Sequence, residues 1–270
     1  MSEPSTYGAC VTDDDLAHRL AQEAGEMLYA FRDAFSATDT DSYGGSRELR
    51  DDGDNRAHDF LVGRLADFRP QDAVLSEEGA DDPARLAASR LWIVDPLDGT
   101  WEFGQGRDDW AVHVALWETG RLVAGAVALP CSQVTYSTSA SLSSAADVQD
   151  ELPTSRPIRI VVSRTRAPDS IDDIAAAITR ETSLPVELVR MGSAGAKAAE
   201  VLAGRVDAYL HDNGLSEWDA AAPVVVALAS GCAAWRFDGS ELRFNRSPPL
   251  IDGLVIATPA LEPYVRSALA

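Results

Sequence analysis

Residues 91–100, LWIVDPLDGT, join a strongly apolar run to a polar turn. The apolar run 91–94 predicts a buried strand, and the proline and glycine that follow predict that the chain turns where the strand ends. Asp95 and Asp98 are three residues apart in this turn, so both carboxylates can be aimed at one point, and the carbonyl of Leu97 can face it too. Carboxylate and backbone oxygens are the ligands that a hard cation such as Mg²⁺ prefers. The alternative is that Asp-Gly simply makes a turn and that Asp95 caps a helix.

Further acidic residues stand at the ends of predicted elements. Glu77 follows an apolar strand, so it lies at a strand end rather than on a solvated helix face. Asp54 precedes a predicted helix and Asp219 stands at the start of another, where capping the N-terminus is the ordinary explanation for an aspartate. Just after the paired aspartates, Gly99 and Thr100 offer N–H groups and a hydroxyl that suit phosphate oxygens, particularly if a helix begins there. Each acid is unremarkable alone, so the information lies in their combination.

The chain is strongly acidic. Its 270 residues carry a formal charge of −20 with a pI near 4.4, which argues against non-specific binding to nucleic acid or to an anionic membrane. An anionic substrate would then need something positive to hold it, and bound metal ions are the obvious candidates. Hydrophobic residues make up 46% of the chain, which is enough to bury a real core.

Several features predict a cytoplasmic protein. Three widely spaced cysteines, without a Cys-x-x-Cys pair, are expected to be reduced. Residues 1–4 do not begin the basic-then-apolar pattern of a signal peptide. The longest apolar run, around residues 220–235, falls short of a membrane span and contains Pro223. We therefore expect no membrane association.

The pattern of elements changes along the chain. The first half predicts helices over 13–35 and 55–68 with a loop or irregular hairpin at 38–53, then strands at 73–75, 91–94, 110–117, 122–129 and 133–138. The second half predicts strands at 158–162, 186–190, 206–211, 233–237 and 254–257, alternating with helices near 170–180, 194–203 and 218–229 and followed by a C-terminal helix. An α+β half followed by an α/β half indicates stacked layers of helix and sheet. We expect domains over residues 1–138 and 158–270, joined by the connection 139–157.

The combined motifs resemble those of the inositol monophosphatase superfamily, in the same order and at similar spacing. They are Gly53-Asp54, Glu77-Glu78, Asp95-Pro-Leu-Asp-Gly-Thr100 and Trp218-Asp219. The resemblance extends over nearly the whole chain, and it implies a layered αβαβα sandwich and a Mg²⁺-dependent, lithium-sensitive phosphatase activity.

The residues around these motifs resemble one group within the superfamily. Glu102-Phe103, where inositol monophosphatases tend to carry Asn-Phe, is similar to the CysQ group of 3′(2′),5′-bisphosphate nucleotidases. Residues 106–113 and 192–197 look like actinobacterial members of that group. The reaction that the resemblance implies is hydrolysis of 3′-phosphoadenosine 5′-phosphate to AMP and phosphate, a step of sulfur metabolism.

The resemblance also implies metal ligands. Glu77, Asp95 and the carbonyl of Leu97 would hold a first Mg²⁺. Asp95, Asp98 and Asp219 would hold a second, with Asp95 bridging, and a weaker third ion would lie near Glu77. Together with Asp54 these acids make five carboxylates, and three Mg²⁺ would leave a local charge of about +1, so the loaded site could accept a phosphate.

Catalytic and substrate contacts follow from the same resemblance. Asp54 and Thr100, together with Glu77, would form the catalytic set, with Asp54 and Thr100 orienting and deprotonating the attacking water. Substrate contacts are implied for Asp98, Gly99, Thr100, Gly192, Ser193, Lys197 and Asp219.

This sequence departs from the family pattern at a lysine on the phosphate side. No lysine precedes Asp54, and only Arg47 or Arg50 stands nearby; Lys197 is close to the place of a nucleotidase lysine, but about one residue displaced. The histidines show no metal-like spacing and are expected to be structural: His18, His58, His113 and His211. Core or rim packing is likewise expected for the tryptophans that could stack on a base: Trp101, Trp110 and Trp218.

Two other functions remain open. One is a broader sugar phosphatase acting on inositol 1-phosphate or fructose 1,6-bisphosphate. The other is a non-catalytic Mg²⁺-binding regulatory protein, against which the intact Asp54–Thr100 pair argues. The partner that we expect for an enzyme is a small-molecule phosphate monoester substrate. A homodimer is common in the family, although no interface stripe is readable in the sequence.

Overall fold

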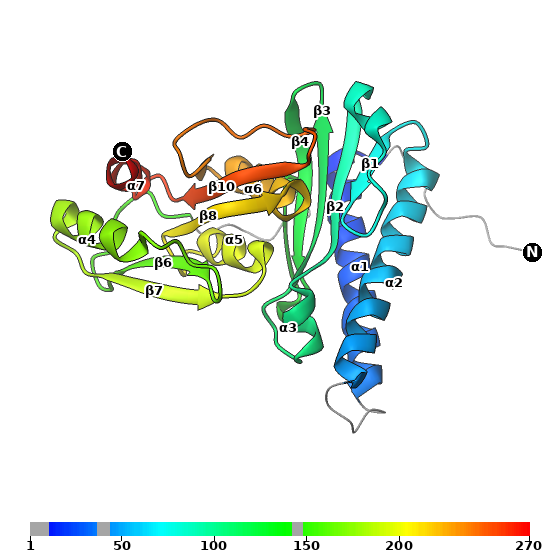
Figure 1. Ribbon diagram of the computed structural model, residues 1–270, viewed down its shortest axis with the longest axis horizontal. Helices are drawn as coiled ribbons and strands as arrows, with labels where there is room; N and C mark the ends of the chain where they lie inside the picture. Colours follow the sequence, from blue (N-terminus) through cyan, green and yellow to red (C-terminus); the bar gives the residue numbers. More distant parts are fainter. Residues whose placement is uncertain (1–10, 37–43, 142–147) are drawn as a thin grey trace, which may run out of the picture.

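The computed structural model describes residues 11–36, 44–141 and 148–270, arranged as five layers of helix and sheet (Figure 1). Helices α1 (Asp13–Ser36) and α2 (Gly44–Phe68) cover the outer face of the first sheet. Helices α5 (Ala194–Leu202) and α6 (Glu217–Ala229) lie between the two sheets. Helices α4 (Ile171–Thr182) and α7 (Glu262–Leu269) cover the far face of the second sheet. The predicted layered αβαβα sandwich is confirmed.

The first sheet has the strand order β1-β2-β3-β4-β5. Its strands are β1 (Ala73–Ser76), β2 (Arg90–Asp98), β3 (Ala111–Glu118), β4 (Arg121–Leu129) and β5 (Val134–Ser137). Strand β1 runs parallel to β2, and the other pairs are antiparallel. Strand β2 is buried along almost its whole length because helices pack on both faces of the sheet. Its last residues therefore carry polar groups into the interior.

The second sheet has the order β7-β6-β8-β10-β9. Its strands are β6 (Ile158–Ser163), β7 (Val186–Met191), β8 (Ala208–Ser216), β9 (Ala233–Trp235) and β10 (Leu250–Ala257). Strands β7, β6 and β8 are parallel, while β10 runs antiparallel to both β8 and β9. The described residues also include the short helices η1 (Pro83–Ala87), α3 (Thr100–Gly104) and η2 (Pro130–Ser132).

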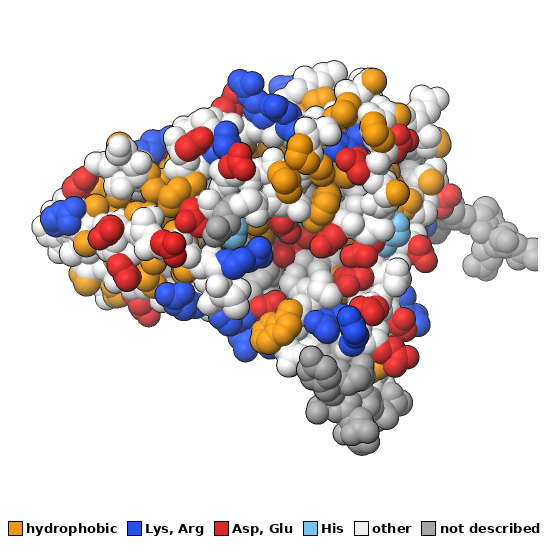
Figure 2. Space-filling view, in the orientation of Figure 1, with side chains coloured by type: hydrophobic (Ala, Val, Ile, Leu, Met, Phe, Trp, Pro, Cys, Tyr) orange, Lys and Arg blue, Asp and Glu red, His pale blue; other side chains and the backbone are white. Residues whose placement is uncertain are grey.

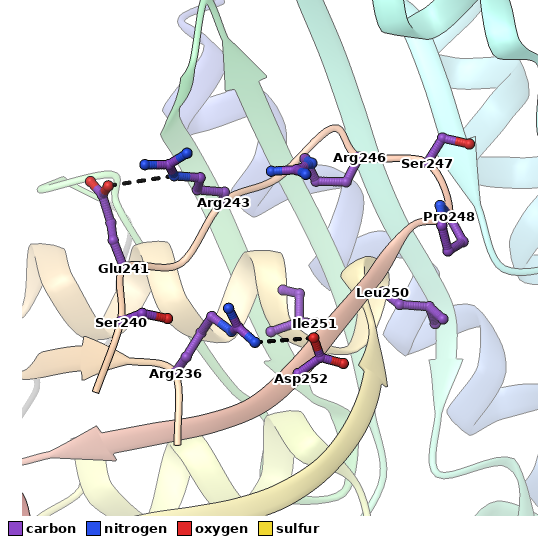
Figure 3. Close-up of a pocket in the computed structure, with 10 residues that line it drawn as sticks. All are labelled: Arg236, Ser240, Glu241, Arg243, Arg246, Ser247, Pro248, Leu250, Ile251 and Asp252. Carbon is purple, nitrogen blue, oxygen red and sulfur yellow. Dashed lines mark hydrogen bonds and ion pairs between the residues drawn. The ribbon is translucent and has the colours of Figure 1, made fainter. Parts of the chain in front are cut away.

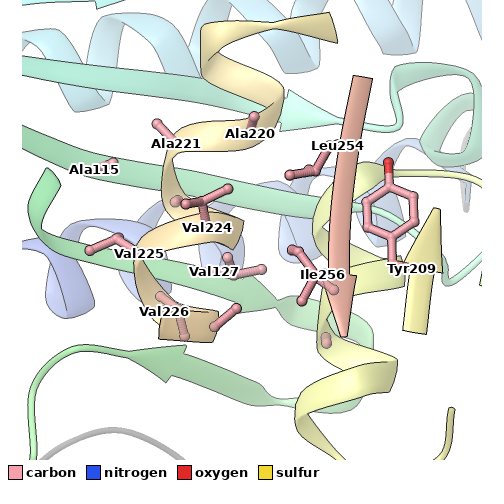
Figure 4. Packing of buried hydrophobic residues seen from close by; sticks show 14 of the residues in the cluster. Ala115, Val127, Tyr209, Ala220, Ala221, Val224, Val225, Val226, Leu254 and Ile256 are labelled. Carbon is pink, nitrogen blue, oxygen red and sulfur yellow. The ribbon is translucent and has the colours of Figure 1, made fainter. Parts of the chain in front are cut away.

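Helix α6 holds the two sheets together. Its valines and alanines pack against Ala115 and Val127 of the first sheet and against Leu254 and Ile256 of the second (Figure 4). A Cβ added at Gly125 would lie 2.4 Å from Cγ1 of Val225, so the helix approaches the backbone of β4 too closely for any side chain. This tight packing sets the position of the first turn of α6, which carries Asp219.

The prediction of a loop or irregular hairpin at 38–53 is wrong from residue 44 onward, because α2 already begins at Gly44. Residues 38–43 lie outside the described residues. The segment 44–53 is polar and rich in glycine, and Leu49, at 5% exposed, is its buried apolar anchor. Gly53 does not mark a turn: a Cβ there would lie 3.0 Å from the Phe103 ring, so glycine allows α2 to pass close to α3.

The remaining predicted elements agree with the structure to within a few residues at their ends. The division into domains 1–138 and 158–270 stays a prediction, and residues 142–147 of the expected connection are not among those described. Within the described parts of the chain, no helix combines the length and apolar character that crossing a membrane requires.

Candidate metal centre and active site

The end of β2 and the first turns of α5 and α6 meet around a cavity of about 290 Å³. Acidic side chains line the hollow at the middle of the face drawn in Figure 2, and basic side chains border it. The lining includes these predicted site residues: Glu77, Asp95, Leu97, Asp98, Gly99, Thr100, Gly192, Ser193, Lys197 and Asp219. The structure therefore brings to one place residues that are widely separated along the chain.

Three aspartates form the centre of this cavity. Oxygen atoms of Asp95, Asp98 and Asp219 all lie within 4.8 Å of one another. Oδ1 of Asp95 accepts a hydrogen bond from the backbone N–H of Leu97 at 3.1 Å, whereas Oδ2 is buried and has no partner among the described residues. A buried carboxylate oxygen without a donor is costly. An oxygen set of this kind fits a hard divalent cation.

Burial and mutual repulsion perturb the acids of the cluster. Burial, and then the charges of Glu77, Asp98 and Asp219, raise the pKa of Asp95 well above its ordinary value. Although Glu77 reaches solvent, the protein around its carboxyl group and the charge of Asp219 raise its pKa to about 7. Burial and the charge of Asp98 raise the pKa of Asp219 to about 6. Carboxylates this close cannot all be ionised at neutral pH without positive charge between them.

Asp98 differs from its neighbours because it is well provided with donors. Its Oδ2 accepts hydrogen bonds from Oγ of Ser193 at 2.6 Å and from the backbone N–H of Gly195 at 2.7 Å. Nε2 of His113 lies 3.2 Å from the same oxygen. Burial alone would raise the pKa of Asp98, but His113 and these donors hold it well below its ordinary range. Asp98 is therefore the acid that is ionised most easily in the cluster.

His113 connects two of the aspartates. Its Nδ1 lies 3.1 Å from the carbonyl oxygen of Trp218, the residue before Asp219, while Nε2 faces Asp98. Sequence reasoning assigned His113 a structural role, and its place in the apolar run 111–117 gave no signal of this contact. Asp219 is the third residue of α6, where its Oδ2 accepts from the N–H of Ser216 at 2.9 Å. The N-cap of that helix is thus Ser216 and not Asp219.

Asp54 lies inside α2, so it does not cap a helix. Oγ1 of Thr100 is 3.3 Å from Oδ1 of Asp54 and 3.0 Å from the carbonyl oxygen of Leu97. A hydroxyl has one proton, so it can donate to only one of these acceptors at a time. Burial, and then the charges of Glu78 and Glu77, raise the pKa of Asp54 to about 7. The predicted Asp54–Thr100 pair is therefore in contact at the edge of the acidic cluster.

Gly99 and Thr100 form the turn from β2 into α3. Gly99 has φ of +93°, a conformation that favours glycine, and the short helix α3, which was not among the predicted elements, begins at the next residue. A Cβ on Gly99 would lie 3.2 Å from backbone atoms of Asp109 and Trp110. The turn is therefore both tight and closely packed, which holds its N–H groups beside the cavity.

A network of charges supports the wall that Gly192 forms. A Cβ on Gly192 would lie 2.0 Å from Oε1 of Glu102, so any other residue there would have to displace the Glu102 side chain. Arg164 donates to Glu102 at 2.6 Å and to Asp109 at 2.5 Å, and Asp109 accepts from the N–H of Gly192 at 2.9 Å. Glu102, the residue that distinguished two groups of the superfamily, thus positions the loop before α5.

Lys197 is buried, at 4% exposed, and lies on the cavity wall. Its Nζ donates to the carbonyl oxygens of Gly192 at 3.1 Å and of Ser193 at 2.5 Å. Burial lowers its pKa to about 8. Arg166 also lines the cavity, and sequence reasoning missed it; Arg47 and Arg50 are not among the lining residues. The cations of this site thus come from the second half of the chain.

The three tryptophans that could stack on a base differ in their burial. Trp101 lines the cavity and is 51% exposed, so a flat ring is available at its edge. Trp110 is fully buried and packs edge-on against Phe103 at a centroid distance of 5.0 Å. Trp218 is partly buried against the central core. Of the three, Trp101 is the one in a position to touch a ligand.

A separate pocket of about 460 Å³ lies between residues 236 and 252 and contains none of the predicted site residues. Figure 3 shows the guanidinium groups of Arg236, Arg243 and Arg246 around it. Arg236 pairs with Asp252 at 3.0 Å, and Arg243 lies 3.7 Å from Glu241. Because two of its arginines face acids and it holds no acidic cluster, the reactive chemistry belongs to the other cavity.

Comparison with known proteins identifies the family of this chain. A model of the inositol monophosphatase family matches residues 12–269. A 3′-phosphoadenosine 5′-phosphate phosphatase of Mycobacterium leprae is 44% identical, covering 96% of this chain and 94% of its own. A protein of the same name from Mycobacterium tuberculosis is 46% identical over 82% of each chain. The crystal structure of CysQ from Bacteroides thetaiotaomicron superposes with a TM-score of 0.70 at 26% identity, covering 94% of this chain and 99% of that one. The chain therefore belongs to the inositol monophosphatase family.

Proposed function

We propose that this protein hydrolyses 3′-phosphoadenosine 5′-phosphate to AMP and phosphate with the help of two to three Mg²⁺ ions. The cluster of Asp95, Asp98 and Asp219, with the unpartnered Oδ2 of Asp95 at its centre, is the observation that carries the proposal. The 44–46% identity to phosphatases named for this substrate supports the choice of substrate. Glu102-Phe103 favours the same choice.

The metal ligands that we propose are Glu77, Asp95, the carbonyl of Leu97, Asp98 and Asp219, and all five line the cavity. When bound, Mg²⁺ would neutralise phosphoryl oxygens, acidify a water molecule and stabilise the leaving oxygen. Without added positive charge the same acids would repel a phosphate dianion. The acidic site would therefore accept an anionic substrate only when Mg²⁺ is bound.

The remaining chemistry belongs to residues of the chain. Asp54 would accept a proton from the attacking water, and its contact with Oγ1 of Thr100 at 3.3 Å supports this role. The N–H groups of the Gly99–Thr100 turn would orient the phosphate. Water oxygen then bonds to phosphorus while the bond from phosphorus to the 3′-oxygen breaks, and that oxygen leaves with the electron pair and takes a proton.

Substrate-panel kinetics test the proposal. Phosphate release is measured side by side from 3′-phosphoadenosine 5′-phosphate, inositol 1-phosphate and fructose 1,6-bisphosphate, with Mg²⁺ and with EDTA. We expect the highest kcat/KM for the nucleotide and no turnover in EDTA. A preference for either sugar phosphate would favour the broader sugar phosphatase. Mg²⁺ binding without release of phosphate from any compound would favour a regulatory protein.

A further inference from the structure

The loop that joins β9 to β10 forms most of the pocket of about 460 Å³ that Figure 3 shows. Residues 236–249 make up this loop and contain no helix or strand. Loops of this length without secondary structure are uncommon in compact proteins and usually carry a function. The volume of the pocket falls within the range of small-molecule sites. The loop and its pocket together therefore indicate a place where a ligand binds.

Three arginine side chains surround this hollow, which we call the arginine pocket: Arg236, Arg243 and Arg246. They come from different parts of the loop, and Figure 3 shows their guanidinium groups around the same space. Like charges repel one another, so a group of three cations is unfavourable unless negative charge lies between them. Because the chain as a whole carries a formal charge of −20, its composition does not explain such a cluster. The cluster therefore points to an anionic ligand.

The acids beside the arginine pocket hold these cations only weakly. Nη2 of Arg236 lies 3.0 Å from Asp252 and 3.5 Å from Asp238, but the two acidic side chains are 83% and 55% exposed. Nε of Arg243 lies 3.7 Å from Glu241, a distance too long for a hydrogen bond. Exposed ion pairs add little stability, so these carboxylates can turn toward solvent when a better partner binds.

Two of the guanidinium groups have donors without partners. The side chain of Arg246 forms no hydrogen bond or ion pair within the described chain, although it lines the pocket. Nε of Arg236 is buried and likewise has no acceptor among the described residues. A buried donor without an acceptor is costly to the fold. Both observations point to oxygen atoms that a ligand would supply.

Contacts with the rest of the protein hold the loop in place before any ligand binds. The buried carboxylate of Glu217 accepts hydrogen bonds from the backbone N–H groups of Asn245 at 2.8 Å and of Arg246 at 2.7 Å. Arg85, at 2% exposed, donates to Oδ1 of Asn245 and to the carbonyl oxygen of Arg246, both at 2.8 Å. Because the backbone of Arg246 is already ordered, binding through its side chain costs less conformational entropy.

We infer that the arginine pocket is a second anion site, which binds a small molecule with several phosphate groups. A guanidinium group pairs with two phosphate oxygens through parallel N–H donors, so three of them can bind more than one phosphate group. The hydroxyl of Ser247, which also lines the pocket, can donate a further hydrogen bond. The inference does not rest on the proposed function, because the arginine pocket and the active-site cavity share no lining residue.

Calorimetric titration with tripolyphosphate tests the inference on the full-length protein after a chelating resin has removed metal ions. A resin replaces EDTA because EDTA is itself a polyanion, and without metal the acidic cluster repels phosphate. We expect one binding event in the wild type. Arg243→Ala and Arg246→Ala should each weaken binding on the order of tenfold, because one charged hydrogen-bonding partner is lost. Both side chains are exposed, so the Tm of each variant should match that of the wild type.

Two further arginines serve as controls for the location of the site. Arg166→Ala removes a cation of the active-site cavity, and Arg121→Ala removes an exposed cation that lines neither pocket. Neither substitution should change the affinity for tripolyphosphate, whereas Arg246→Lys should keep part of it. Orthophosphate and citrate should bind more weakly than tripolyphosphate, since they offer one phosphate group or none.

Three results would overturn the inference. They are absence of binding in the wild type, affinity that neither Arg243→Ala nor Arg246→Ala lowers, and a loss that appears only in Arg166→Ala. Equal affinity for citrate and tripolyphosphate would overturn the assignment to phosphate. Because the titration involves no turnover, each of these results leaves the proposed function standing.

Discussion

Oγ of Ser193 lies 2.6 Å from Oδ2 of Asp98, although 95 residues separate the two in the sequence. Ser193 is the N-cap of α5, and Asp98 is the last residue of β2. The same oxygen accepts a hydrogen bond from the N–H of Gly195. The start of α5 therefore holds the end of β2, a strand of the first sheet. With Oδ2 held in this way, the orientation of the Asp98 carboxylate toward Asp95 and Asp219 is fixed before any ligand binds.

Ser193→Ala should weaken metal binding without abolishing the fold. The substitution removes one donor to a buried carboxylate, at a cost of about 1–3 kcal/mol in stability. A ligand less firmly oriented should raise the Mg²⁺ concentration for half-maximal activity on the order of tenfold. Thermal unfolding and Mg²⁺ titrations measure the two effects. Ser240→Ala, on the exposed loop after β9, serves as the control, and an unchanged Mg²⁺ requirement in Ser193→Ala would contradict the holding role.

The acidic cluster predicts an unusual dependence of stability on pH in the metal-free protein. Glu77 and Asp54 have pKa values raised to about 7, and Asp219 to about 6, so the folded chain binds these protons more tightly than the unfolded chain. Their contribution to the free energy of unfolding is present at low pH and is lost as pH rises through about 6 to 7.

Mg²⁺ binds the deprotonated acids, so its stabilising effect should have the opposite dependence on pH. We expect the difference in Tm between Mg²⁺ and EDTA to be larger at pH 8 than at pH 6. Taking this difference removes the contribution of histidines that titrate equally in both samples. An equal or larger difference at pH 6 would count against the cluster as the metal site.

Glu217 should position Asp219 from two residues away. Its side chain is fully buried and accepts the N–H groups of Asn245 at 2.8 Å and of Arg246 at 2.7 Å. Glu217→Gln replaces one accepting oxygen with an NH₂ group that faces a donor, which should cost about 1–3 kcal/mol. Since α6 begins at Glu217 and carries Asp219 in its first turn, a shift of this turn should also raise the Mg²⁺ concentration for half-maximal activity. Loss of stability with an unchanged Mg²⁺ titration would show that Glu217 only stabilises the loop that contains Asn245 and Arg246.

Gly192→Ala should damage the cavity wall by overpacking. The new methyl group would fall 2.0 Å from Oε1 of Glu102 and would push Glu102 away from Arg164. We expect a loss of about 1–3 kcal/mol in stability and a raised KM for the nucleotide. Gly106→Ala is a glycine control without close neighbours, although its φ of +67° adds some strain of its own. A wild-type Tm and KM in Gly192→Ala would show that the close approach of Gly192 to Glu102 affects neither stability nor nucleotide binding.

The sequence predicted the elements better than the contacts between them. The run into Asp95 and Asp98 identified a strand end, and the apolar pattern identified the layers, because both signals are local in the chain. It misjudged residues 44–53, where polar composition concealed a helix whose Gly53 serves close packing and not a turn. Local pattern also gave no sign that a histidine would meet an aspartate.

Residues brought together by the fold had the weakest signals. His113 is the one polar residue of the apolar run 111–117, yet its Nε2 lies 3.2 Å from Oδ2 of Asp98. His211 and Arg166 reach the cavity from β8 and from the loop after β6, and neither stands in a recognisable motif. Their roles depend on tertiary neighbours, which periodicity and spacing do not encode.

The most direct test of the account is turnover and Mg²⁺ binding by Asp95→Asn, with Asp173→Asn on the exposed face of α4 as control. Phosphate release from 3′-phosphoadenosine 5′-phosphate and the heat of Mg²⁺ binding are measured on the same samples. We predict that Asp95→Asn keeps its fold, loses calorimetric Mg²⁺ binding and turns over on the order of 100- to 1000-fold more slowly, because several kcal/mol of charge stabilisation is removed. Near-normal kcat with unchanged Mg²⁺ binding in Asp95→Asn would contradict the proposal that Asp95 holds the catalytic Mg²⁺.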